Sequence, residues 1–436
     1  MHLRLLLALL ILATANARAD EPRFDVTSYD VEITPDFDSK SISGTERIRF
    51  TSLADGLDRI NFSANTLTVY ASINGDSMVS QEIVGDRRVF HLPAPVAKGE
   101  AATLLVTFRG MAPKGLVFDG RTVSANYFTC DYMICDQDRT ADRAHLSLAL
   151  TLARDMEVIA PGRLLRTTPA ASGMKTMHWR TTQPRSAYLF GFAAGDFQRI
   201  TLPGHKPTLD VLTIAAPAAQ VLDMFADTRR MLEFFEHKAG VPFPGNTYTQ
   251  VLVRGSEAQE AASHAVIGLP EIEPILKDPH EDWVIAHELA HQWWGNAITC
   301  ADWSELWLNE GLVVFMVAAY KEQRWGKADY ARELELANKR WQAARDQGFD
   351  VPLSWKGKYP SLRMKRAMAY AKSVIFLDTL RSNLGEDIFW RALKRYTRDN
   401  FNRTVTATDL QRAFETESRQ DLTAQFNHWV FGETPM

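Results

Sequence analysis

The ten residues from 287 to 296, which read HELAHQWWGN, constrain the fold of this chain more than any other segment. His287 and His291 are four positions apart, so in an α-helix their imidazoles lie on one face, about one turn apart. Glu310 follows His291 after eighteen residues. A fold that uses these three groups together must hold the first segment as a helix and return the chain to it through a loop and the start of a second helix.

These residue types predict a catalytic metal site. Two imidazoles and one carboxylate are the ligands that zinc prefers, and a site with three protein ligands leaves the fourth tetrahedral position open. We therefore expect one zinc ion per chain, bound by His287, His291 and Glu310. Glu288 is adjacent and is not needed as a ligand, so we expect it to act as the general base. Solvated helix positions are the alternative, but the flanking residues are mostly apolar and predict a buried helix.

The N-terminus and the overall charge narrow the class of protein. Residues 1–19 are typical of a signal peptide, with Arg4, an apolar stretch over residues 5–13 and Ala17-Arg18-Ala19 before the expected cleavage point. Removing Arg4 and Arg18 from the 49 basic residues leaves 47 against 53 acidic ones, a charge of −6. This balance argues against an obligate nucleic-acid partner. We expect an exported protein, periplasmic or extracellular, without a membrane span.

The pattern of the chain changes near residue 204. Before it, short alternating segments such as 29–34, 47–51 and 102–108 predict a largely antiparallel β-sheet domain over residues 20–204. After it, helical periodicity dominates, and residues 205–436 form the second predicted domain. The fold class is therefore multidomain α+β.

Several helices of the second domain are marked by their ends. Residues 217–237 predict an amphipathic helix, and a strand is expected over 248–253. The helix of the histidines is predicted to begin at Asp278 and Pro279 and to stop at Gly295. A helix over residues 303–325 would carry Glu310 in its first half and end before Gly326. Two more helices are expected over 366–383 and 386–398.

The cysteines and tryptophans leave few functional options. Cys130 and Cys135 could form a disulfide or remain two free thiols, and the sequence does not decide between these. Cys300 is expected to be a buried thiol. Four tryptophans lie close to the metal ligands in sequence, and we expect them to belong to the core rather than to contact substrate; they are Trp293, Trp294, Trp303 and Trp307.

The segment HELAHQWWGN, followed by ITCADWSELWLNEG at residues 298–311, resembles peptidase family M1, the aminopeptidase N-like gluzincins. That family carries H-E-x-x-H, eighteen residues, and a glutamate within W-L-N-E-G. The resemblance is high over residues 283–326 and looser elsewhere. It implies an N-terminal β domain followed by a thermolysin-like zinc metallopeptidase domain, acting on a peptide or protein substrate.

The same resemblance selects one candidate for stabilising the oxyanion. From the residues alone the donor could be Tyr359, Tyr370, Arg363 or Arg366. Tyr370-Ala371-Lys372-Ser373 is similar to the family segment Y-x-K-G, whose tyrosine stabilises the tetrahedral intermediate. On that resemblance Tyr370 is the expected donor.

One segment of the family is missing from the expected place. The motif G-A-M-E-N, whose glutamate holds the free amine of the substrate, is expected between residues 255 and 270 and does not occur there. Glu257 or Glu260 could take over the role, but each is more simply interpreted as a solvated loop charge. The residues that bind substrate are therefore not identified by the sequence.

These observations predict a zinc-dependent peptidase, most simply an aminopeptidase. The alternatives are an endopeptidase or specialised zinc hydrolase without free-amine recognition, and a non-catalytic binding module of the same family. Residues 426–435 resemble the close of the family's catalytic domain. A more open cleft, or one closed by a second subunit, is therefore expected, so an oligomer is possible.

Overall fold

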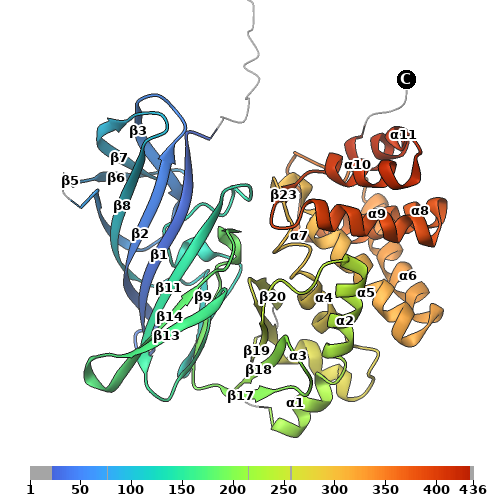
Figure 1. Ribbon diagram of the computed structural model, residues 1–436, viewed down its shortest axis with the longest axis horizontal. Helices are drawn as coiled ribbons and strands as arrows, with labels where there is room; N and C mark the ends of the chain where they lie inside the picture. The colour runs from blue at the N-terminus through green and yellow to red at the C-terminus, as the bar shows by residue number, and fades with distance from the viewer. Residues whose placement is uncertain (1–21, 76, 215, 256–257, 433–436) are drawn as a thin grey trace, which may run out of the picture.

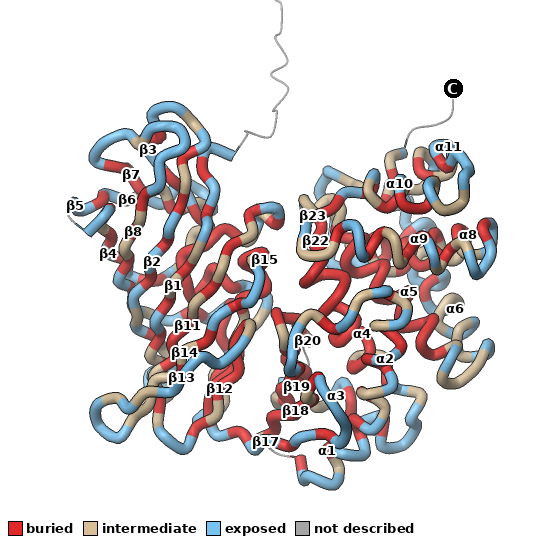
Figure 2. Tube along the Cα trace, viewed as in Figure 1, coloured by how far each residue is buried: buried red, intermediate tan, exposed pale blue. Residues whose placement is uncertain are grey.

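The computed structural model describes residues 22–75, 77–214, 216–255 and 258–432 (Figure 1). The predicted signal peptide and Glu257 lie outside these residues. Within them, one hydrophobic core forms inside a β-rich N-terminal part and a second inside a helix-rich C-terminal part. The predicted α+β organisation is confirmed. Figure 2 shows buried residues along the chain in both parts.

The N-terminal part is built on a large sheet in which β1 and β11 are parallel and the other paired strands are antiparallel. Buried and exposed side chains alternate along β1, as the period of a strand requires, so one face of the sheet supplies the core. In order across the sheet the strands are β13 (Arg163–Pro169), β14 (Met174–Arg180), β11 (Arg143–Ala153), β1 (Phe24–Asp36), β2 (Ser41–Ser52), β8 (Ala101–Gly110), β4 (Thr68–Ile73) and β5 (Ser77–Met78), with β15 (Arg185–Ser186) beside β11.

Two smaller sheets complete this part. Phe24 of β1 makes edge-to-face ring contacts with Phe50 and with Phe62 of β3, which joins the large sheet to a smaller one. Cys130 and Cys135 form a disulfide, with their Cα atoms 5.1 Å apart, so the bridged alternative is the correct one. The remaining strands are β3 (Leu57–Ser63), β7 (Arg87–Val96) and β6 (Ser80–Val84) in one sheet, and β12 (Glu157–Ile159), β16 (Ala193–Gly195), β10 (Thr122–Ala125) and β9 (Leu116–Asp119) in the other.

A further sheet carries the helices of the C-terminal part. Its central strands β18, β19 and β21 are parallel, whereas the outer strands β17 and β20 pair antiparallel to their neighbours. The outer strand β20 lies beside helix α4 (Figure 1). The strands are β17 (Gln198–Thr201), β18 (Thr208–Thr213), β19 (Thr247–Val253), β21 (His264–Gly268) and β20 (Ala258–Ala261). The division at residues 204 and 205 stays a prediction, and β17 pairs with β18 across it.

Helices make up most of the rest of the described chain. They are α1 (Ala218–Met224), α2 (Thr228–Ala239), α3 (Leu269–Ile272), α4 (Trp283–Ala290), α5 (Trp307–Trp325), α6 (Lys327–Arg345), α7 (Leu362–Arg366), the π-helical segment η6 (Ala367–Lys372), α8 (Ser373–Leu384), α9 (Glu386–Asp399), α10 (Ala407–Ser418), α11 (Thr423–Phe426) and the π-helical segment η7 (Asn427–Phe431). Short strands β22 (Thr299–Cys300) and β23 (Thr404–Val405) pair in parallel, and single 3-10 turns include η1 (Thr129–Asp131), η2 (Ala171–Gly173), η3 (Ala187–Leu189), η4 (Glu273–Leu276) and η5 (Trp303–Glu305). None of the described helices is both long and apolar enough to cross a membrane.

Local signals located some helix ends and misplaced others. Helix α5 ends at Trp325 before Gly326, as predicted. The predicted start of the histidine helix at Asp278 is wrong, since α4 begins at Trp283. Asp278 instead accepts a hydrogen bond from the backbone N–H of His280, closing a turn before the helix. The single helix predicted over 217–237 is two helices, α1 and α2, separated by a turn.

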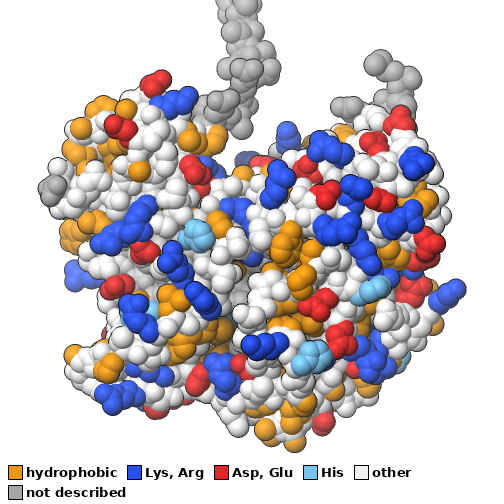
Figure 3. Space-filling view, in the orientation of Figure 1, with side chains coloured by type: hydrophobic (Ala, Val, Ile, Leu, Met, Phe, Trp, Pro, Cys, Tyr) orange, Lys and Arg blue, Asp and Glu red, His pale blue; other side chains and the backbone are white. Residues whose placement is uncertain are grey.

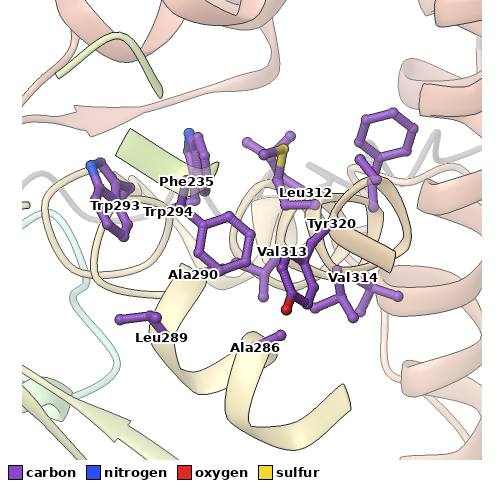
Figure 4. Packing of buried hydrophobic residues seen from close by; sticks show 14 of the residues in the cluster. Phe235, Ala286, Leu289, Ala290, Trp293, Trp294, Leu312, Val313, Val314 and Tyr320 are labelled. Atoms are coloured by element: carbon purple, nitrogen blue, oxygen red, sulfur yellow. The ribbon is translucent and has the colours of Figure 1, made fainter. Parts of the chain in front are cut away.

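The tryptophans after the histidines belong to the core, as expected. Trp293 and Trp294 are fully buried and pack with Phe235 of α2, as Figure 4 shows beside helices α4 and α5. Trp307 is also fully buried, whereas Trp303 is half-buried and donates its indole N–H to the carbonyl of Gln137.

On the face drawn in Figure 3, acidic and basic side chains are interspersed.

Candidate active site

Helices α4 and α5 bring the predicted ligands to one point. The Nε2 atoms of His287 and His291 lie 3.0 Å apart, and each lies 3.4 Å from Oε2 of Glu310. All three side chains are buried. In a tetrahedral zinc site with bonds of about 2.0 Å, ligand atoms are about 3.3 Å apart, so this triangle has the required size. The three residues that the sequence selected therefore do meet.

The chemistry of the donors also fits a zinc ion. Oε2 of Glu310 is buried and accepts no hydrogen bond from the described residues, which is costly for a carboxylate unless a cation binds it. Burial lowers the pKa of His287 to about 4, so its imidazole is neutral and its Nε2 lone pair is free. His287, His291 and Glu310 form the metal site.

The chain after α4 fixes the orientation of the second histidine. The Nδ1–H of His291 donates to the carbonyl oxygen of Trp294, 3.0 Å away, which leaves Nε2 directed at the metal. Gly295 makes this possible. Its φ is +135°, and a Cβ there would lie 2.8 Å from Nδ1 of His291. The backbone therefore turns sharply over the imidazole, where only glycine fits.

Glu310 is held from the residues on either side of it. Oδ1 of Asn309 accepts the backbone N–H of Cys300, and its Nδ2 donates to Oη of Tyr188. Gly311 lets α5 approach the segment η6 closely, because a Cβ at this position would lie 2.1 Å from Cβ of Ser373. The W-L-N-E-G segment thus fixes the third ligand through its neighbours, and Cys300 is the expected buried thiol.

Glu288 and Tyr370 both lie at the metal ligands. Glu288 is buried, its Oε2 has no hydrogen bond within the described part of the chain, and burial raises its pKa well above the ordinary value. The ring of Tyr370 stacks near His287, with ring centres 6.2 Å apart. Burial first, then the nearby Glu310 carboxylate, raises the pKa of the Tyr370 hydroxyl, which therefore stays protonated and able to donate. The other tyrosine considered, Tyr359, packs in a separate cluster against Phe349.

Glu260 is the site residue that sequence interpretation placed wrongly. It is 8% exposed rather than solvated, on strand β20. Its carboxylate, that of Glu288 and the imidazole of His291 have ligand atoms within 4.8 Å of one another. Burial, opposed by the nearby His291 and supported by the Glu310 carboxylate, raises the pKa of the Glu260 carboxyl to about 7. Ala258–Ala261 has no alternating strand pattern of its own, and the local signal was only its place just before the apolar strand His264–Gly268.

Strand β20 is fastened to the segment that follows the histidines. Gln292 donates through Nε2 to the carbonyl of Ala261 and accepts the backbone N–H of Ser263, at 3.1 and 3.0 Å. Asn296 donates to the same carbonyl of Ala261, at 3.3 Å. We call Gln292 and Asn296 the strand brace. The polar residues of HELAHQWWGN therefore set the place of Glu260 relative to the metal ligands.

Comparison with known proteins agrees with this site. Residues 224–429 match the family model described as Peptidase family M1 domain. The chain is 24% identical over 314 residues to Aminopeptidase N from Acetobacter pasteurianus, covering 66% of this chain and 88% of that protein. It is 22% identical over 436 residues to Aminopeptidase 2 from Candida albicans, covering 92% of this chain and 46% of that protein. The chain thus spans about half the length of some of these relatives.

Solved structures share the whole described fold. An M1 zinc metallopeptidase from Deinococcus radiodurans superposes with a TM-score of 0.77 at 23% identity, covering 93% of this chain and 94% of that one. A mutant of an M1 zinc metallopeptidase from the same organism, bound to a Tyr-Ser-Ala substrate, gives a TM-score of 0.78 with 95% of both chains covered. The two-part architecture of this chain is therefore that of these proteins.

Proposed function

Because this chain belongs to peptidase family M1, we propose that it is a zinc-dependent aminopeptidase that hydrolyses the first peptide bond of its substrate. The observation that carries the proposal is the position of Glu260. The ligand atoms of Glu260, Glu288 and His291 lie within 4.8 Å of one another. Glu260 is on strand β20, which the strand brace ties to the segment after α4. A carboxylate there offers a charged partner to a peptide's free amine beside the reacting bond.

Glu288 moves the protons of the reaction. Zinc, when bound by His287, His291 and Glu310, polarises the scissile carbonyl and acidifies water. The Glu288 carboxylate accepts the proton of the attacking water and gives it to the leaving amine. Burial raises the pKa of Glu288 above its ordinary value, which makes the carboxylate a stronger base than an exposed one.

Tyr370 stabilises the charge that develops on the carbonyl oxygen. Its hydroxyl lies among the metal ligands and remains protonated, so it donates a hydrogen bond as the oxyanion forms. Tyr370 lies in the π-helical segment η6, and such segments shift the direction of side chains relative to a regular helix. The departure from α-helix supports a role that depends on where this hydroxyl points.

The test compares a tripeptide with a free amine and its N-acetylated form. We expect kcat/KM for the acetylated peptide to be lower by about 10²-fold or more, because Glu260 then lacks its charged partner. Replacing Glu260 with Ala should remove most of this discrimination. Equal rates on both peptides would identify an endopeptidase or other zinc hydrolase without amine recognition. Cleavage of neither peptide by a protein that holds its zinc would identify a binding module.

We also propose that the protein is exported to the periplasm or the cell exterior. The pattern of residues 1–19 supports this, and so does the Cys130–Cys135 disulfide, since such bonds persist in oxidising compartments. Fusing residues 1–19 to a reporter that is active only after export tests the proposal. A reporter that stays inactive would contradict it.

A further inference from the structure

Gln259, next to Glu260 on β20, makes an unusual contact for neighbouring residues of a strand. Successive side chains of a strand point to opposite faces. Here the Nε2 of Gln259 lies 2.9 Å from Oε2 of Glu260 and 2.9 Å from the carbonyl oxygen of Glu260. Both residues are 8% exposed. The amide of Gln259 therefore bends back along the strand and holds its neighbour's carboxylate in a buried setting.

The orientation of this amide follows from its partners. Both neighbouring atoms of Glu260 are acceptors, so the amide nitrogen, a double donor, must face them. The amide Oε1 of Gln259 is buried and without a hydrogen bond among the residues that the structure describes. Of the two carboxylate oxygens of Glu260, Oε2 is engaged by Gln259, and Oε1 has no hydrogen bond to another described side chain.

We propose that Gln259 is a positioning residue for amine recognition: its amide fixes Oε2 of Glu260 and so directs Oε1 at the free amine of the substrate. The proposal rests on the aminopeptidase function proposed above. In the family segment G-A-M-E-N the residue before the glutamate is methionine, whereas in this chain the residue before Glu260 is Gln259. A thioether cannot donate a hydrogen bond, so this chain holds its carboxylate in a way that the motif does not offer.

The charges around Glu260 explain why a neutral donor suits this position. Glu288 and Glu310 are close enough to interact electrostatically with Glu260, and both repel its carboxylate. Without a fixed donor, this repulsion favours side-chain positions farther from the reacting bond. A lysine or arginine in place of Gln259 would also hold the carboxylate, but its charge would repel the amine of the substrate. An amide supplies the hydrogen bond and adds no charge.

The surroundings of Gln259 allow a clean substitution. Its side chain lines a cavity of about 360 Å³ between strands β9 and β10 on one side and β19 and β21 on the other. Methionine has nearly the same length and shape as glutamine, so Gln259→Met removes the donor without crowding the strand. Ser124 lines the same cavity and has no hydrogen bond to Glu260 among the described contacts, so Ser124→Ala is the matched control.

The experiment measures kcat and KM of the zinc-loaded full chain on the free-amine tripeptide. We expect Gln259→Met to raise KM about tenfold and to change kcat less than threefold, because a lost hydrogen bond to a charged group has about this effect on binding. Gln259→His, whose ring N–H can donate at a similar reach, should restore much of the loss. Ser124→Ala should leave both constants unchanged.

Three outcomes decide between the proposals. An unchanged KM in Gln259→Met, with intact preference for the free amine over the acetylated peptide, would overturn the role of Gln259 alone. A wild type that cleaves both peptides equally would overturn the proposed function instead. An equal fall in kcat for the Met and His variants would indicate general damage to the site and would also contradict positioning.

Discussion

Glu288 has no hydrogen-bond partner for its Oε2 among the described residues, although it is buried beside three other ionisable groups. This is consistent with the role proposed for Glu288, which acts on the attacking water and does not stabilise the fold. Replacing Glu288 with Gln should lower kcat/KM by about 10³-fold or more while the zinc content stays at one ion per chain. Peptidase assays paired with elemental analysis check this. Exposed Glu271→Gln is the control, and wild-type turnover in Glu288→Gln would refute the assigned mechanism.

The role proposed for Tyr370 concerns the charge that develops in the transition state. Tyr370→Phe keeps the ring beside His287 and removes only the hydroxyl. We expect kcat to fall by about 10²- to 10³-fold with little change in KM, because the lost hydrogen bond forms only as the oxyanion develops. Tyr359→Phe, in a different cluster, should have no such effect. A rise in KM at constant kcat would instead show that Tyr370 binds substrate.

Glu46, far from the catalytic residues in sequence, links stability to pH. Its Oε2 accepts the backbone N–H of Ile134, 2.7 Å away within the disulfide loop, and burial raises its pKa to about 8. Between pH 4.5 and 8 the folded chain keeps this proton and the unfolded chain loses it, so stability falls as pH rises, by about 1.4 kcal/mol per pH unit at most. Below about pH 4.5 the carboxyl is protonated in both the folded and the unfolded state, so the stability that Glu46 contributes no longer changes with pH.

Glu46→Gln should remove that part of the pH dependence. The variant should gain stability relative to the wild type as pH rises from 5 to 8, by a few kcal/mol in total. Urea unfolding of both proteins at several pH values checks this. A difference in unfolding free energy that does not vary with pH would show that Glu46 is not protonated in the fold.

At the level of elements, sequence interpretation succeeded where the information was local. The spacing of His287, His291 and Glu310 was enough to predict α4 and α5 meeting at a metal, and Gly326 marked the end of α5. Glu260 could not be found this way, because its place depends on the pairing of β20 with β21 and on the side chains of the strand brace. Such contacts between distant segments leave no periodic pattern. A polar strand residue therefore looked like a solvated loop.

The contact between α5 and η6 controls the third zinc ligand. Gly311→Ala would place a Cβ 2.1 Å from Cβ and 2.6 Å from Oγ of Ser373, and 2.9 Å from the carbonyl of Ala369. These two segments must separate, moving Glu310 on one and Tyr370 on the other. We expect a loss of about 3 kcal/mol in stability and weaker zinc binding, measured by thermal unfolding with and without chelator.

A second substitution keeps that prediction specific. Ser373→Gly removes the Cβ that the new methyl group meets, so adding it to Gly311→Ala should restore part of the zinc affinity. The close approach of the Ala369 carbonyl remains, so recovery is incomplete. If the double variant binds zinc no better than Gly311→Ala, the loss does not arise from this contact.

At the scale of the whole molecule, the half-buried Arg143 ties the β-rich part to the helical part. Arg143 of β11 donates to the carbonyl of Pro184 in its own part, and to those of Ala297 and Arg403 in the other, at 3.3 and 2.9 Å. Arg143→Ala removes a hydrogen bond from each carbonyl: Pro184 keeps the donor Arg185 and Arg403 keeps the backbone N–H of Thr299, whereas Ala297 keeps no other donor among the described contacts. We expect it to cost roughly 3 kcal/mol in unfolding free energy, whereas the exposed Arg166→Ala should cost almost nothing. Urea unfolding that gives the same midpoint for both variants would contradict this.

The strand brace joins Glu260 to the same segment that carries the zinc ligands, so the carboxylate and the metal cannot shift independently. The separation between Glu260 and the metal ligands therefore limits the length of backbone between a peptide's amine and its first carbonyl. On the proposed function, we expect this separation to fit one α-amino acid. A first residue with an additional backbone carbon would be too long for this separation, whatever its side chain. On that proposal, we expect the length of the first backbone unit to select substrates, together with the shape of the first side chain.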